Sequence, residues 1–336
     1  MFKTSILKKL IIISDFSISL SELKKRYSFL KSKNLFKNKI VFSINANKKK
    51  INYKYKKGIF KNRNNSIFLC IRGKKLIIKN SIFEYKIKIF IDRDFPQLDL
   101  INIIDDLIII KFIQSEFLPI HSSGFSFKKK SKLFASFGGI GKTRIILEAI
   151  KFYDKCKIFD EWCLIKNNTL LPFRQEVLLM DYDILSNKNF FNRLDFYRAK
   201  ISSLTPFKKI NEILRILRVS LPYKYMIFKN INSFNIKQIL FITQKKKAKT
   251  KFIAVKKSFF ARQILENFKH EKKQLFKLVL LNNSIDRFNK KISLIKIYNN
   301  LLIRLLKKCK FRNFIIDKNK KNFKTLFLKI LQDDKY

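Results

Sequence analysis

The stretch that decides the fold is Leu133-Phe-Ala-Ser-Phe-Gly-Gly-Ile-Gly-Lys-Thr143, near the middle of the 336-residue chain. It contains three of the chain's six glycines, and Lys142 and Thr143 follow them directly. Small residues in front of a Lys-Thr pair let backbone N–H groups close around a phosphate. The stretch therefore predicts a phosphate-binding loop. It departs from the consensus GxxxxGK[ST] at Ser136, where the consensus has glycine.

The residues on either side of the loop support this prediction. Residues 132–136 form a short apolar run suited to a buried strand, and residues 143–153 carry Ile146, Ala149 and Ile150 at helical spacing. A strand, a glycine-rich turn and a helix are the context that a phosphate loop requires. The alternative is a glycine-rich turn that precedes a lysine by chance in a lysine-rich chain.

Each part of the loop has a predicted role. We expect the backbone N–H groups of residues 137–143 to converge on the β-phosphate, Lys142 to neutralise the β- and γ-phosphate oxygens, and the Thr143 hydroxyl to ligate Mg²⁺. The predicted nucleotide-binding residues are Ser136, Phe137, Gly138, Gly139, Ile140, Gly141, Lys142 and Thr143.

A nucleotide site also needs a carboxylate. Residues 157–159 resemble a strand, and Asp160 and Glu161 come at its end. Asp160 would ligate the metal, directly or through water, or accept a proton from an attacking hydroxyl. The alternative is that Asp160 and Glu161 are simply two solvated polar residues at the end of a strand. His121 precedes the loop strand in Leu118-Pro-Ile-His-Ser-Ser-Gly124, and a lone histidine is more often structural than catalytic.

In this order, the segments resemble the C-terminal kinase domain of HPr kinase/phosphorylase and, more closely, the broad set of HPr-serine-kinase-like P-loop proteins. The family pattern is a DFP element, a helix, a histidine, a strand, a P-loop and a strand that ends in two acids. Its counterparts here are Asp94-Phe95-Pro96, a helix to Phe117, His121, the glycine loop and Asp160-Glu161. The similarity covers roughly residues 85–175, and its specificity lies in the order and spacing of the elements.

The resemblance implies an ATP–Mg²⁺ site. Lys142 and Thr143 would bind phosphate and Mg²⁺, and His121 would lie near the phosphates. Asp160 would stand where the family places its general base, with Glu161 as the second acid. The implied catalytic residues are thus Asp160, Lys142 and His121, and the implied metal ligands are Thr143, Asp160 and Glu161.

Three features depart from the family. Ser136 replaces the first P-loop glycine, Arg144 stands where the bifunctional enzymes carry Glu, and no glycine follows Gly141. The later glycine-containing signature of true HPr kinase/phosphorylases is therefore absent. We expect a diverged nucleotide-binding relative rather than an enzyme that phosphorylates HPr.

The composition limits which kinds of partner and cellular compartment are expected for the protein. The formal charge of +51 alone would indicate a nucleic-acid partner, but the chain is also rich in Ile, Asn, Phe and Tyr and poor in Gly and Pro. That joint bias is typical of an AT-rich genome, so specific nucleic-acid binding is not favoured. The four cysteines form no CxxC pair, which predicts buried thiols in a reducing compartment. With no apolar run long enough to span a membrane, we expect a cytoplasmic protein.

We expect an α/β fold with a P-loop, HPr-kinase-like core, a central sheet flanked by helices, and a smaller β-rich N-terminal part. The predicted domains are residues 1–91, rich in strands, and residues 92–336, which bind the nucleotide and end in a helical part. The predicted activity is transfer of the γ-phosphoryl group of ATP to a hydroxyl of a protein serine or a small metabolite. The alternatives are a nucleotide-binding accessory or regulatory protein with little kinase activity, and a basic nucleic-acid-binding protein. The acceptor and the oligomeric state stay open.

Overall fold

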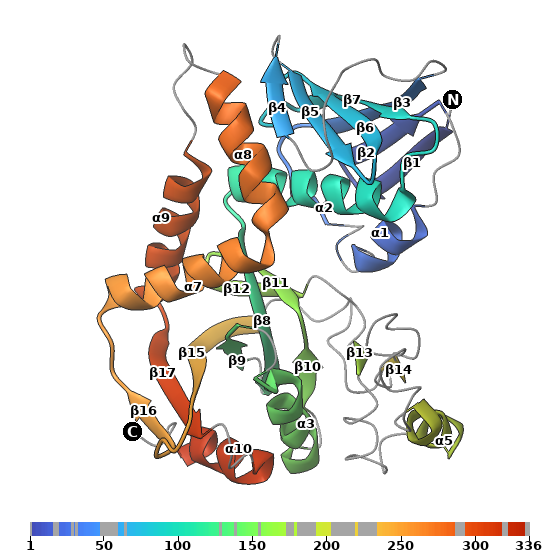
Figure 1. Ribbon diagram of the computed structural model, residues 1–336. Helices are drawn as coiled ribbons and strands as arrows, with labels where there is room; N and C mark the ends of the chain where they lie inside the picture. The colour runs from blue at the N-terminus through green and yellow to red at the C-terminus, as the bar shows by residue number, and fades with distance from the viewer. Residues whose placement is uncertain are drawn as a thin grey trace. The chain divides into compact units, whose positions relative to one another are not determined.

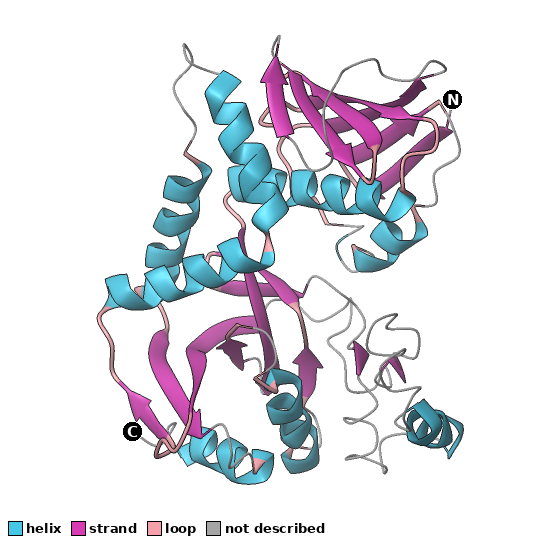
Figure 2. Cartoon of the chain, in the orientation of Figure 1, coloured by secondary structure: helices cyan, strands magenta, loops and turns pink. Residues whose placement is uncertain are grey.

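The computed structural model describes residues 2–15, 20–27, 30, 33–47, 60–63, 66–127, 130–137, 140–153, 156–172, 178–179, 193–202, 219–220, 234–285, 293–317 and 322–332 (Figures 1 and 2). The chain divides into two compact units, each built from two separate segments. Unit 1 comprises Met1–Pro119 and Leu265–Leu305, and unit 2 comprises Ile120–Ile264 and Leu306–Tyr336. The described parts of both units combine helices with a mixed sheet, which confirms the α/β class.

Unit 1 is organised around one mixed sheet. Its spatial order among the described strands is β1 (Phe2–Leu7), β2 (Leu10–Ser14), β3 (Ile40–Asn47), β7 (Lys86–Asp92), β6 (Lys74–Lys79), β5 (Ser66–Ile71) and β4 (Phe60–Arg63). β2, β3 and β7 are parallel, whereas β7, β6, β5 and β4 pair antiparallel. The strand-like runs at residues 66–71 and 75–79 predict a hairpin around Arg72-Gly73. The structure confirms it, because β5 and β6 pair antiparallel and Arg72 and Gly73 form their turn with positive φ angles of 52° and 77°.

The helices assigned to unit 1 are α1 (Ser21–Arg26), α2 (Gln97–Gln114), α8 (Lys273–Ile285) and most of α9 (Leu294–Leu306). α2 packs against α1 and α8, and α8 also contacts β4 and β5. The spacing of Ile104, Leu107, Ile108 and Phe112 predicts a helix with Asp105, Asp106 and Gln114 off its apolar face. The two aspartates are nonetheless only 3% and 4% exposed, because α2 is covered on almost every side.

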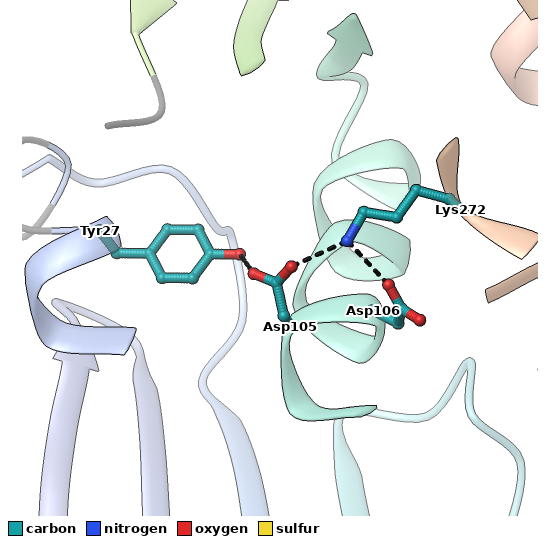
Figure 3. A network of polar contacts seen from close by, with 4 residues as sticks. All are labelled: Tyr27, Asp105, Asp106 and Lys272. Atoms are coloured by element: carbon teal, nitrogen blue, oxygen red, sulfur yellow. Dashed lines mark hydrogen bonds and ion pairs between the residues drawn. The ribbon is translucent and has the colours of Figure 1, made fainter. Parts of the chain in front are cut away.

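The two buried aspartates belong to a polar network (Figure 3). Tyr27 Oη donates a hydrogen bond to Asp105 Oδ1 over 2.6 Å. Lys272 Nζ bridges both carboxylates, at 2.8 Å from Asp105 Oδ2 and 2.9 Å from Asp106 Oδ1. Burial lowers the pKa of Lys272, but the two carboxylates raise it by more, so the net shift is upward. The network ties the C-terminal segment of unit 1 to α2 and to the residue that follows α1.

Unit 2 is built on a second mixed sheet. The following strands pair one after another across the sheet. β10 (Lys157–Phe159) pairs with β8 (Leu118–Phe127), β8 with β9 (Lys130–Ala135), β9 with β15 (Phe234–Lys245), and β15 with β17 (Lys310–Asp317). β9, β15 and β17 are parallel, and β8 runs antiparallel to both β9 and β10. β10 and β9 therefore point in the same direction, and their carboxyl ends lie at one edge of the sheet.

Shorter strands complete this sheet. Residues 162–165 and 169–172, on either side of Asn167-Asn168, predict a hairpin. The structure confirms it in β11 (Trp162–Lys166) and β12 (Thr169–Pro172), with Asn167 and Asn168 at positive φ in the turn. β12 also pairs with β15, and β16 (Lys251–Ile253) pairs antiparallel with β17. β13 (Leu178–Leu179) and β14 (Val219–Ser220) form a separate small ladder.

Two helices share one hydrophobic core with the sheet of unit 2. α3 (Lys142–Phe152) and α10 (Phe323–Gln332) pack against each other and onto alternate residues of β9, β15 and β17. The core includes Phe134, Ile146, Leu240, Phe314 and Phe327. Two further helices are α5 (Arg193–Ser202), in unit 2, and α7 (Lys257–Glu271), whose residues are divided between the units. The strand–loop–helix order predicted around the glycines is thus confirmed.

Three other expectations can be compared with the structure. The predicted boundary between residues 91 and 92 does not coincide with the division into units, because α2 groups with the N-terminal sheet. Cys70, Cys156 and Cys163 are buried free thiols as expected, and Cys309 is a half-buried one. Among the described residues, no helix combines the length and apolar character needed to cross a membrane.

Candidate functional site

The glycine loop connects β9 to α3 at the carboxyl edge of the unit 2 sheet. β9 ends at Ala135, and α3 begins at Lys142. Gly141 caps α3 with a φ of 89°, in the left-handed region that favours glycine, and its carbonyl accepts a hydrogen bond from Ile145 N over 3.2 Å. Of the predicted loop residues, Gly138 and Gly139 lie outside the described part of the chain, and the other six are described.

Lys142 folds back over the start of the loop. Its side chain is mostly buried, and Nζ donates to Ser136 Oγ over 3.0 Å and to the Ser136 carbonyl over 3.2 Å. Ser136 is itself fully buried and donates to the Phe137 carbonyl over 2.9 Å. Its hydroxyl thus offers the ammonium group an oxygen that glycine would not. A bound phosphate would present competing oxygens to the same ammonium group.

Thr143 and Asp160 meet although they are seventeen residues apart in the sequence. Thr143 lies in the first turn of α3, and its hydroxyl donates to Asp160 Oδ2 over 2.8 Å. Asp160 follows β10 directly. The pair is adjacent because β10 and β9 end at the same edge, on either side of β8. The structure therefore brings together the helix that follows the glycine loop and the carboxylate that the sequence proposed as its partner.

Asp160 and Glu161 sit in a strained turn. Trp162 N donates to the Asp160 carbonyl over 3.0 Å, and Glu161 between them has a φ of 69°. This i to i+2 bond with a positive central φ describes a γ-turn, a rare form in which strain is stored. Ser122 N donates to the Glu161 carbonyl over 3.0 Å, so β8 holds the turn in place.

Sequence reasoning assigned no role to Ser123, which contacts Asp160 from the other side. Ser123 Oγ donates a hydrogen bond to Asp160 Oδ1, and Glu161 N donates to the same oxygen over 2.9 Å. Ser123 lies on β8, where it pairs with Phe134 of β9. The sequence signal that could have identified Ser123 is the alternation of side chains along the strand, because it puts His121 and Ser123 on the same face.

His121 is at the loop edge of the sheet. Ser122 pairs with Ala135, so His121 comes level with Ser136 at the start of the loop. Its half-buried imidazole lies beside the Trp162 indole, with ring centroids 5.2 Å apart and planes inclined by 37°. By strand register, His121 therefore lies at the level of the start of the glycine loop.

Cysteine chemistry is not favoured at this edge. Cys163 is fully buried near Ser122 and shares a 3.3 Å hydrogen bond with the Ser122 hydroxyl. Burial raises the pKa of the Cys163 thiol to about 12, although the contacts with Ser122 and the Ile120 carbonyl act in the opposite direction. The thiol stays protonated near neutral pH, and the protonated form is a poor nucleophile.

The oxygen atoms at the site fit a magnesium ion. Mg²⁺ takes oxygen ligands and usually keeps several waters beside one or two protein groups and the substrate phosphates. The Thr143 hydroxyl and Asp160 Oδ2 supply two adjacent oxygens of the required kind. Three or more His, Cys, Asp or Glu side chains do not gather into a metal-binding group anywhere in the described residues. Glu161, the third predicted ligand, adjoins the pair in sequence and is half-buried.

Residues of β15 and α10 also contact the glycine loop. Gln244 at the end of β15 donates to the Ile140 carbonyl over 3.1 Å. Phe137 stands edge-on to Phe241 at 5.8 Å between ring centroids and keeps 39% of its surface exposed. Phe323 of α10 fills the space beside Gly141, since a Cβ on Gly141 would lie 2.8 Å from its ring.

Comparison with models of known protein families gives no match for this chain, and comparison with curated proteins gives none either.

Proposed function

We propose that the glycine loop, Thr143 and Asp160 form an ATP–Mg²⁺ site of the HPr-serine-kinase-like kind, and that the protein transfers the γ-phosphoryl group to a hydroxyl. The observation that carries the proposal is the 2.8 Å hydrogen bond between Thr143 and Asp160. P-loop enzymes hold Mg²⁺ with a loop Ser or Thr and an Asp from a neighbouring strand. Two residues of these types, so far apart in the sequence, meet here beside a glycine loop.

Each residue has a defined part in this proposal. The backbone N–H groups of the loop and the N-terminus of α3 face the phosphates, and Lys142 exchanges its bonds to Ser136 for phosphate oxygens. A magnesium ion at Thr143 and Asp160 would supply neutralisation of phosphate charge. Asp160 accepts the proton of the acceptor hydroxyl while that oxygen bonds to the γ-phosphorus. The bond from the γ-phosphorus to the bridging oxygen breaks, and ADP leaves with its electron pair.

Nucleotide binding is tested with Lys142→Ala, with ATP titrated in the presence and absence of Mg²⁺. We expect a loss of affinity of about tenfold or more, because the cation nearest the phosphates is removed. Lys269→Ala is the matched control, since Lys269 is a surface lysine paired with Glu266. Mg–ATP binding that survives Lys142→Ala unchanged would overturn the proposed site.

Group transfer is tested separately, because the acceptor is unidentified. ATP labelled at the γ-phosphate is incubated with a lysate of the source organism and either the wild-type protein or Asp160→Asn. The kinase proposal predicts a labelled product that depends on the wild-type carboxylate. If both proteins bind Mg–ATP and neither labels an acceptor, the nucleotide-binding accessory function replaces the kinase.

A second candidate function, binding of a polyanion, is favoured by one surface feature. Five exposed lysines follow closely in sequence in and around the loop that joins β15 to β16: Lys245, Lys246, Lys247, Lys249 and Lys251. β15 is parallel to β9, so this loop leaves the sheet at the same edge as the glycine loop. Binding to a mixed-sequence oligonucleotide should then weaken steeply with salt. Replacement of the five lysines by Gln should abolish that binding, and an unchanged affinity would exclude this function for the β15–β16 loop.

A further inference from the structure

We infer that Ser123 is a positioning residue that fixes the carboxylate of Asp160 so that Oδ2 is its working oxygen. This inference rests on the proposed function. The two carboxylate oxygens of Asp160 accept hydrogen bonds from different donors. Oδ1 accepts from Ser123 Oγ and from Glu161 N, whereas Oδ2 accepts from Thr143 Oγ1. The donors to Oδ1 come from the sheet and its turn, and the donor to Oδ2 comes from the helix that follows the loop.

The two sets of contacts respond differently to a bound nucleotide. Thr143 is the residue whose hydroxyl oxygen would face a metal, so its bond to Oδ2 is the one exchanged on binding. A carboxylate held only by Thr143 would then be free to rotate about its terminal bond, since such torsions have broad energy wells. Ser123 and Glu161 N keep Oδ1 in place, and Oδ2 stays directed toward the space that the metal and the acceptor hydroxyl would enter.

Ser123 is suited to positioning and not to substrate contact. Its side chain is fully buried, so a nucleotide or an acceptor has no access to it. Its backbone is fixed within β8, which pairs with β9 at Phe134 and with β10 one residue further along, at Gly124. The same strand thus aligns the Ser123 hydroxyl with both the phosphate-loop strand and the strand that ends at Asp160.

The neighbouring serines of β8 have other partners. Ser122 points to Cys163, and Ser126 exchanges a hydrogen bond with Ser131 next to the β8–β9 turn. Both are buried like Ser123. Ser126→Ala is therefore a matched control that removes a buried hydroxyl from the same strand at a distance from Asp160.

The test measures how Mg²⁺ strengthens ATP binding. ATP is bound to the full-length protein while Mg²⁺ is titrated, for the wild type, Ser123→Ala, Ser123→Thr, Ser126→Ala and Asp160→Asn. We expect Ser123→Ala to raise the half-saturating Mg²⁺ concentration about tenfold, as for loss of a hydrogen bond to a charged group, with metal-free ATP affinity unchanged. Ser123→Thr, which restores the hydroxyl, should return the wild-type value, and Ser126→Ala should keep it.

The outcomes separate this inference from the proposed function. If Asp160→Asn raises the Mg²⁺ requirement and Ser123→Ala does not, the site stands and the positioning role is wrong. If the wild type shows no Mg²⁺-dependent ATP binding, the proposed function fails and the inference fails with it. Should Ser123→Ala not fold, judged by circular dichroism, the nearly isosteric Ser123→Cys takes its place. Cysteine is a weak donor, so the same rise in Mg²⁺ requirement is expected, and a wild-type requirement would contradict the inference.

Discussion

The Thr143 hydroxyl donates to Asp160 Oδ2 over 2.8 Å and joins the first turn of α3 to the end of β10. The bond crosses the width of β8, the antiparallel strand that separates β9 from β10. In a sheet with only parallel strands, each strand would contribute its carboxyl end to this edge. Here β8 runs the opposite way and has its amino end at this edge. Ser123, on β8, therefore contacts the Asp160 carboxylate from a different direction than Thr143 does.

Thr143→Ala should weaken Mg²⁺-dependent ATP binding about tenfold and leave metal-free binding nearly unchanged, because only the metal side of the site loses an oxygen. Thr143→Ser keeps the hydroxyl and should retain most of the affinity. Calorimetric titration with and without Mg²⁺ measures both. Equal losses in the two conditions would show that Thr143 does not act through a metal.

Lys272→Met should lower the free energy of unfolding by about 3–5 kcal/mol, because it leaves Asp105 and Asp106 buried without their shared cation. Lys269→Met is the control: its ion pair with Glu266 lies on the surface, so a change below about 1 kcal/mol is expected. Urea unfolding monitored by circular dichroism compares them. Similar losses in the two variants would show that the network in Figure 3 contributes no more than a surface pair.

Lys111 should make stability depend on pH. Its side chain is fully buried on α2 and donates to the Ile82 carbonyl over 2.7 Å and to Gln114 over 3.1 Å. Burial lowers its pKa from 10.5 to about 7, against an opposing effect of Glu84. Between these pH values the unfolded chain holds a proton that the folded chain lacks. The free energy of unfolding should therefore rise with pH, by up to about 1.4 kcal/mol per pH unit.

Lys111→Met isolates this effect. The free energy of unfolding of the wild type, minus that of Lys111→Met, should increase by about 2 kcal/mol from pH 7 to pH 9. Below pH 7 the lysine is protonated in both states, and the difference should level off. Parallel pH profiles for the two proteins would show that Lys111 stays charged in the folded state.

Gly124→Ala should destabilise unit 2 by about 3 kcal/mol or more, since overpacking a fixed backbone strains it. A Cβ at this position would lie 2.3 Å from the Lys132 carbonyl oxygen and 2.4 Å from the Phe159 ring. Gly73 is the comparison, with a φ of 77° and no atom within 4 Å of the position that a Cβ would take, so Gly73→Ala should cost only about 1–2 kcal/mol. Equal urea midpoints would mean that β8 can move away from its neighbours.

Phe323→Ala should loosen the glycine loop. The Phe323 ring fills the space beside Gly141 and lies 5.3 Å from the Arg144 guanidinium carbon. Loss of the ring should speed amide hydrogen exchange at residues 140–143 about fivefold or more, because the loop opens more often. Phe323→Leu keeps most of the bulk and should stay close to the wild type. Unchanged exchange in Phe323→Ala would show that α10 does not restrain the loop.

The sequence predicts well what depends on local pattern. The strand before the glycine cluster and the helix after it follow from periodicity, and the structure reproduces both. The predictions of a strand and a helix succeed because neighbouring residues determine them. Asp160 was expected at a strand end, near the metal that Thr143 would bind, and the structure shows a hydrogen bond between the two side chains.

The sequence fails where the partner is distant in the chain. Asp105 lies off the apolar face of its helix in the sequence pattern, and no residue near it indicates that it pairs with Lys272, 167 residues later. Ser123 carries no motif, and its role follows only from the register of β8 between β9 and β10. The division into units was missed for the same reason, since each unit joins two segments that are far apart.

The discontinuity of unit 1 imposes an order of events during synthesis. Asp105 and Asp106 leave the ribosome long before Lys272, and at ~5–20 residues per second the 167-residue interval from Asp105 lasts roughly 10–30 s. In that time the N-terminal sheet has no Lys272 ammonium group to neutralise the two carboxylates of α2. Residues 120–264 of unit 2 emerge in the same interval. A nascent chain stalled before residue 272 should therefore hold an incomplete unit 1, which marks this stretch as the period when a chaperone would be needed most.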